Sequence, residues 1–155
     1  MSNVSNGRWS NSWKIGLDAE ELFVKTMESK GHVVEKTSIE VDRKSHIDFY
    51  VDGYGFDVKG NRKLNSIWLE IVNVQGNDGW LKGEAHFIAF LFEKLDHFKV
   101  FKREDLLYWV ANNVHEMTDN NREHLKLYTR PGRQDLIVKV KYEHIRHLPH
   151  SVIKC

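Results

Sequence analysis

The segment His46–Lys59 constrains the fold of this chain most, because apolar and polar residues alternate along it in two consecutive runs. Such alternation predicts strands that are buried on one face. The two runs are separated by Asp52-Gly53-Tyr54-Gly55, a sequence typical of a turn. The segment therefore predicts a β-hairpin. The apolar face of its first strand would consist of Ile47, Phe49 and Val51, and that of its second strand of Phe56 and Val58.

The polar positions of this hairpin carry the candidate chemistry, namely Asp48 on the first strand and Asp57 and Lys59 on the second. A carboxylate on an apolar strand destabilises a fold unless it is paired. Two carboxylates and an ammonium suit a divalent metal and a reacting phosphate, since Mg²⁺ prefers oxygen ligands and a lysine can stabilise developing negative charge. The alternative is a surface hairpin with an ordinary Asp–Lys ion pair.

The acid-x-lysine pattern is common, and it also occurs at Glu28-Ser29-Lys30 and Asp42-Arg43-Lys44. Those two stretches fall at an expected helix end and in an expected polar loop, where they would be solvated surface charges. Only Asp57-Val58-Lys59 lies inside an apolar strand.

Asp48 followed by Asp57-Val58-Lys59 resembles the active-site motif of the PD-(D/E)xK nuclease superfamily, over roughly residues 15–92. This superfamily includes many type II restriction enzymes, archaeal-type Holliday junction resolvases and phage exonucleases. The resemblance implies an α/β (α+β) fold with a restriction endonuclease-like αβββαβ core, in which helices flank a mixed central sheet. Ile47 stands where the name-giving proline of the motif would be.

The resemblance also implies a cofactor, Mg²⁺ with Mn²⁺ as a substitute, held by Asp48, Asp57 and the Val58 carbonyl while Lys59 acts on water. The pattern Gly16-x-x-x-Glu20 resembles that of the resolvase branch, which implies Glu20 as a further ligand. Helix periodicity alone does not choose between Glu20 and Glu21, and either could simply complement the helix dipole.

Further candidates surround this motif, each with an ordinary surface charge as the alternative. Glu70, Gln75 and His46 are candidate supporting residues for the metal site. The candidate phosphate contacts are Arg62 and Lys63 after the hairpin, and Arg130 and Arg133, with Arg122 and Lys126, in a late basic segment. His144, His147 and His150 near Cys155 suggest zinc, but Pro149 would break the helix needed to align them.

The remaining pattern predicts a single domain at residues 15–155 after a flexible tail at residues 1–14. Helices are expected at 15–30, 103–115 and 143–148, and strands at 32–36, 66–73, 85–92, 98–101, 125–128 and 136–140. Polar segments at 38–45 and 118–123 and a glycine-rich segment at 75–83 are expected to be loops.

The composition of the chain limits the cellular compartments and the binding partners that we expect for the protein. A net charge of +1 provides no global field for nucleic acid, so binding must depend on local basic clusters. One cysteine excludes an intrachain disulfide and suits a reducing compartment. There is no apolar run of membrane length and no signal pattern. We therefore expect a cytoplasmic protein without a membrane partner, a location that includes the cytoplasm of a phage-infected host.

These observations favour a metal-dependent endonuclease that hydrolyses DNA, with a lean towards junction resolution. A restriction- or repair-type enzyme, an RNA-directed nuclease, and a non-cleaving nucleic-acid-binding protein on the same fold stay open as alternatives. Cutting two antiparallel strands calls for two sites related by a two-fold axis. We therefore expect a homodimer, joined through Trp9 and Trp13 or through Trp80.

Overall fold

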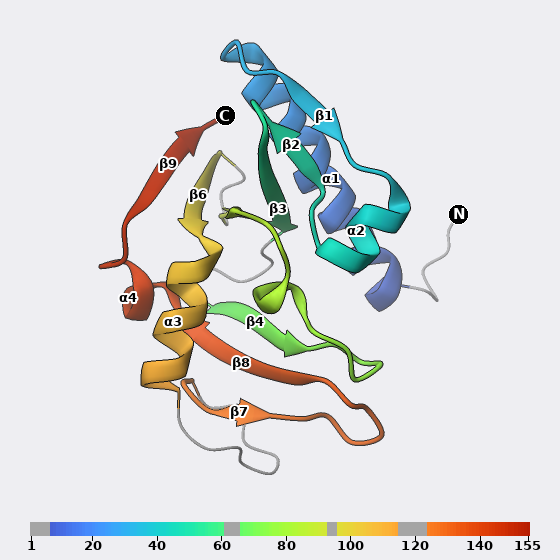
Figure 1. Ribbon diagram of the computed structural model, residues 1–155, viewed down its shortest axis with the longest axis vertical. Helices are drawn as coiled ribbons and strands as arrows, with labels where there is room; N and C mark the ends of the chain where they lie inside the picture. Colours follow the sequence, from blue (N-terminus) through green and yellow to red (C-terminus); the bar gives the residue numbers. More distant parts are fainter. Residues whose placement is uncertain (1–6, 61–65, 93–95, 115–123) are drawn as a thin grey trace.

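The computed structural model describes residues 7–60, 66–92, 96–114 and 124–155, with side chains from residue 18 onwards. The protein belongs to the α+β class, with a mixed six-stranded sheet and a three-stranded antiparallel sheet (Figure 1). The helices are α1 (Gly7–Ser29), α2 (Ile39–Ser45), α3 (Arg103–Asn113) and α4 (Tyr142–Ile145).

The larger sheet has the strand order β1-β2-β3-β5-β6-β9. Its strands are β1 (Val34–Lys36), β2 (Phe49–Val51), β3 (Tyr54–Gly60), β5 (Phe87–Leu91), β6 (His97–Lys102) and β9 (His150–Lys154). Strands β3 and β5 run parallel and all other neighbours run antiparallel. The predicted hairpin is β2–β3, and the mixed central sheet is confirmed.

The smaller sheet has the order β4-β8-β7 and consists of β4 (Ser66–Val72), β7 (Leu127–Tyr128) and β8 (Leu136–Lys141). Burial alternates along β4, where Ile67, Leu69 and Ile71 are buried and the residues between them are half-buried. This alternation confirms the predicted strand and its apolar face.

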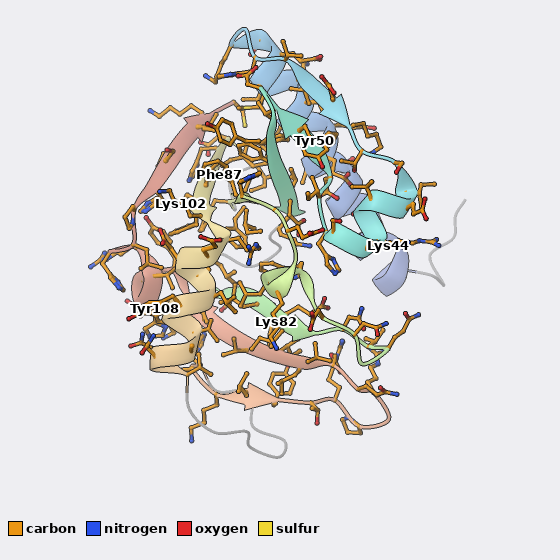
Figure 2. All side chains as sticks on the ribbon, in the orientation of Figure 1. Lys44, Tyr50, Lys82, Phe87, Lys102 and Tyr108 are labelled. Atoms are coloured by element: carbon orange, nitrogen blue, oxygen red, sulfur yellow. The ribbon has the colours of Figure 1, made fainter. Side chains whose placement is uncertain are left out.

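Two hydrophobic cores form because the larger sheet is covered on both faces. Helix α1 packs Phe23 and Met27 against Phe49, Phe56 and other residues on one face. The opposite face packs against β4, β8, α3 and the short 3-10 helix η2 (Trp80–Lys82). Side chains fill the space between these elements in Figure 2, whereas the labelled Tyr108 projects outward from α3 and is 74% exposed.

Three segments differ from their predictions. Helix α1 begins at Gly7, well before Ile15, so helix occupies part of the expected tail. The expected polar loop at 38–45 contains α2, because the Ser38 hydroxyl accepts a hydrogen bond from the Val41 N–H at 3.2 Å and caps the helix. The end of the chain adds β9 to the edge of the larger sheet, a pairing with β6 that local pattern does not reveal.

The predicted position of Ile47 on the face of Phe49 and Val51 is wrong. Strand β2 begins only at Phe49, and His46 has a left-handed backbone with φ of 56°. This bend ends the alternation, so Ile47 packs in the core beside β4 while Phe49 and Val51 face α1.

The connection from β3 to β5 is also unlike the expected αβββαβ pattern. In its described part, residues 66–86, this connection contains β4 and η2 and no α-helix. The loop expected at 118–123 falls in a stretch without a described structure. Across the described ranges, no helix is long and apolar enough to cross a membrane.

Candidate active site

Strand β3 positions the two charged residues of the predicted motif. Phe56 and Val58 face α1, so alternation turns Asp57 and Lys59 towards the opposite side of the sheet. Asp57 is only 3% exposed, and its Oδ1 lies 3.1 Å from Lys59 Nζ. The ammonium also lies 4.8 Å from the centroid of the Trp80 ring. An ion pair between a buried aspartate and a half-buried lysine is therefore held against an aromatic ring.

Asp48 is fastened to β3 by two hydrogen bonds. Its backbone N–H donates to the Phe56 carbonyl at 2.8 Å, and its Oδ2 accepts from the Val58 N–H at 2.8 Å. Because both anchors flank Asp57, the two aspartates are held beside one another. The register of the hairpin therefore brings Asp48 and Asp57 together, although they are separated in the sequence.

The electrostatics of this site reflect crowding of negative charge. Burial and the neighbouring Asp57 charge raise the pKa of Asp48 to about 6. Burial also raises the pKa of Asp57, and the nearby Lys59 ammonium opposes this rise only in part. Burial would lower the pKa of Lys59, but the Asp57 and Asp48 carboxylates outweigh that effect and raise it. Lys59 is therefore a cation at neutral pH.

The Oδ2 atom of Asp57 is buried and has no hydrogen-bond partner among the described residues. A buried carboxylate oxygen without a partner is costly, and a cation is the ligand that would satisfy it. Asp57 and Asp48 supply oxygen donors of the kind that Mg²⁺ prefers, so the donor chemistry fits. In the described ranges, however, no three His, Cys, Asp or Glu side chains are grouped in a way that could hold a metal ion.

Glu20 lies on the α1 side of the same site. Its Oε1 is 3.6 Å from Lys36 Nζ, and its charge contributes to raising the pKa of Asp48. Glu21, its neighbour, is exposed. Glu20 thus acts electrostatically on Asp48, and its role as a ligand stays a prediction.

Glu70 and His46 approach the site from the other side. Burial raises the pKa of Glu70, and the charges of Lys59 and His46 oppose that rise. The His46 ring is held by a 3.1 Å hydrogen bond between Nε2 and the Asp78 carbonyl. Gln75 is exposed in the turn after β4, and none of its described hydrogen bonds reaches the aspartates.

Asp42 is a site residue that the sequence pattern did not identify. Burial, the Asp48 charge and a hydrogen bond to Asp48 raise the pKa of the Asp42 carboxyl to about 6. Asp42 is exposed, as expected for the surface charges of Asp42-Arg43-Lys44, but its carboxyl also interacts with Asp48. Ser38, a strong N-cap residue four positions earlier, was the signal that a helix could present this carboxylate to the site.

Some of the predicted phosphate contacts fall in the part of the chain that the structure describes. Arg62, Lys63 and Arg122 lie outside the described residues. Arg130 forms an ion pair with Asp135, with its Nε 2.8 Å from Oδ2, and Asp135 is fully buried. This pair holds the loop between β7 and β8, which leaves Arg133 as the exposed arginine there.

Two further predictions also have structural outcomes. Trp80 is 7% exposed and packs against Phe90 and Lys59, so the expectation that it supplies an exposed dimer contact is wrong. Two of the histidines considered for zinc, His144 and His150, have separate partners. His144 Nδ1 accepts from the Lys141 N–H and caps α4, whereas the His150 ring stacks on Phe101.

The fold and the site together define an α+β protein with a cluster of two buried aspartates and a half-buried lysine at the open end of the β2–β3 hairpin. No protein-family model, curated protein or solved structure matches this chain. Its function therefore has to be inferred from the residues of the site.

Proposed function

We propose that the protein is a metal-dependent nuclease of the PD-(D/E)xK type that hydrolyses phosphodiester bonds in DNA. The observation that carries the proposal is the buried Asp57, which is paired with Lys59 through Oδ1 and has an unpartnered Oδ2 beside Asp48. A purely structural ion pair has no need of a second buried carboxylate, since each adds a desolvation cost.

The order of elements supports the proposal in part. Helix α1, strands β1 to β3 and the parallel strand β5 follow the first and last parts of an αβββαβ core. The place of the second helix is taken by β4 and η2, which pack on the corresponding face of the sheet. We infer a restriction endonuclease-like core in which a second sheet replaces this helix.

The roles of the side chains follow from their charges and positions. Asp48 and Asp57 would hold Mg²⁺ or Mn²⁺, with Glu20 and the Val58 carbonyl as further candidate ligands. The bound cation would supply positive charge and a more acidic water. Lys59 stays protonated beside Asp57, so it can donate a hydrogen bond to the attacking water or to the phosphate oxygens as negative charge develops.

The decisive experiment combines cleavage with metal binding. Asp57→Asn keeps the size of the side chain and removes its charge, so cleavage of plasmid and four-way DNA in Mg²⁺ should fall at least about 100-fold. Mn²⁺ should raise the melting temperature of the wild-type protein and leave that of the variant unchanged. Asp52→Asn, an exposed aspartate in the hairpin turn, is the matched control. Wild-type cleavage rates in Asp57→Asn would refute the site.

Lys59→Met tests the role of the ammonium apart from that of the metal ligands. Methionine removes the charge and keeps an apolar side chain against the Trp80 ring. We expect loss of single-turnover cleavage with metal affinity retained. A variant that cuts normally would contradict the role of the ammonium.

The substrate panel also distinguishes the alternatives. Linear, nicked, single-stranded and four-way DNA and a matched RNA separate junction resolution from restriction, repair and RNA-directed cleavage. A protein that binds these molecules without cutting them would be a binding protein on this fold.

The proposal also includes the assembly and the location of the protein, namely a homodimer in the cytoplasm.

A further inference from the structure

The face of the smaller sheet opposite to its buried aliphatic residues carries half-buried basic and aromatic side chains. Residues of β4 alternate, so Ser66, Trp68 and Glu70 share the face opposite to the buried Ile67 and Leu69. Glu70 lies near Lys59, and Trp68 follows about 7 Å further along the strand. This face is therefore continuous with the site.

Lysines stand directly opposite these residues on the neighbouring strand. The antiparallel register pairs Trp68 with Lys139 and Ser66 with Lys141. Lys139 Nζ lies 5.9 Å from the centroid of the Trp68 ring, and Trp68 also makes an edge contact with Tyr128 at 5.6 Å between centroids. The indole is thus held in place from two sides while remaining half-buried.

Histidines extend this surface beyond the lysines. The backbone of His124 forms an isolated parallel β-bridge with that of Lys139. The His124 Nε2 atom lies 3.4 Å from the Ser66 hydroxyl. The His144 ring is 6.0 Å from that of His124. Burial lowers the pKa of His124, and the charges of Lys139 and Lys141 lower it further. Positive charge therefore dominates around Lys139 and Lys141. The carboxylate of Glu143 lies 3.8 Å from the Lys141 ammonium.

We propose that this surface, formed by Trp68, Lys139, Lys141 and His124, binds a nucleic-acid strand with unpaired bases and guides it to the candidate active site. Lysines contact phosphates without regard to sequence, and an indole face stacks on a base. A duplex keeps its bases stacked on one another, so Trp68 favours an unpaired strand. The choice of partner rests on the proposed function.

Binding in EDTA tests this surface apart from cleavage. Fluorescence anisotropy with a labelled oligonucleotide should show that Lys139→Ala/Lys141→Ala binds single-stranded DNA about tenfold more weakly than wild type. The slope of log K against log salt should fall by about 1.4, the value for two lost phosphate contacts on a single strand. Lys102→Ala/Lys154→Ala removes the same charge from exposed positions of β6 and β9 and should bind like wild type. Figure 2 shows Lys102 well away from the smaller sheet.

Trp68→Leu tests the stacking part. Leucine keeps an apolar contact with Tyr128, and an unchanged melting temperature verifies the fold. We expect about tenfold weaker binding of single-stranded DNA and little change with a duplex. Equal losses with both DNAs would refute the preference for unpaired bases.

The two proposals can fail separately. If the wild-type protein cuts DNA but the lysine pair binds like its control, the surface is wrong and the nuclease stands. If no metal supports cutting but the lysine and tryptophan variants lose binding, the surface stands and the nuclease proposal is wrong. Equal binding by all variants overturns the surface in either case.

Discussion

At the scale of single residues, Asp48 shows how a candidate site makes the fold depend on pH. Its pKa is raised from 3.8 to about 6, so between these values the folded chain binds more protons than the unfolded chain. Stability contributed by protonated Asp48 is present at low pH and is lost as pH rises through this window. In EDTA, we expect the melting temperature of the wild-type protein to decrease between about pH 4 and pH 6 for this reason.

Asp48→Asn should remove this part of the pH dependence and stabilise the metal-free protein at pH 7.5 by about 1–2 kcal/mol. An asparagine oxygen can still accept from the Val58 N–H. Asp52→Asn is a control in which the change in stability should have the opposite sign. Hydrogen bonds from His32 and Val33 lower the pKa of Asp52, so its charged form stabilises the fold and its replacement should destabilise it. Thermal melting in EDTA across pH 4–8 measures both. Parallel curves for wild type and Asp48→Asn would contradict the buried position of Asp48.

At the scale of elements, Gly79 holds η2 against β4 and so sets the position of Glu70. Its N–H donates to the Ile71 carbonyl at 2.8 Å, and a Cβ at this position would lie 2.6 Å from the Glu70 carbonyl oxygen. Because the obstacle is backbone, the strand or the helix must move. We expect Gly79→Ala to cost about 1–3 kcal/mol and to weaken cleavage.

Asn77→Ala is the matched control for the same loop, since the Asn77 side chain is exposed. Urea unfolding gives the free energy of unfolding of both variants. If Gly79→Ala unfolds at the wild-type midpoint, the close approach of η2 to β4 is wrong.

At the scale of the whole molecule, the prediction to be tested is that the protein forms a homodimer. The Trp80 side chain is part of the core and cannot itself supply the dimer contact, which leaves the N-terminal helix or the rest of the Trp80 loop as candidates. Positions 9 and 13 lie four residues apart in α1, which places them on one side of a helix. We expect light scattering at micromolar concentration to give twice the chain mass of 18.3 kDa, and Trp9→Ser/Trp13→Ser to give a monomer with an unchanged melting temperature. A wild-type monomer that cuts both strands in one binding event would contradict the need for a dimer.

Local pattern was sufficient wherever a residue's environment depends on its immediate neighbours. Alternation in β3 placed Asp57 and Lys59 on the face away from Phe56 and Val58, because successive side chains of any strand point to opposite faces. Strand β4 and the late hairpin were predictable for the same reason, whereas the mixed sheet was expected only from the resemblance to the nuclease superfamily.

Only the tertiary structure decided which elements meet. The bend at His46 moved Ile47 into the other core, and the helix after Ser38 brought Asp42 to Asp48. The sequence by itself therefore determined the strands and the charged face of the hairpin, because periodicity is a local property. Packing between distant segments decided that Trp80 is buried and that β4 joins a second sheet, since these depend on contacts across the chain that no short stretch encodes.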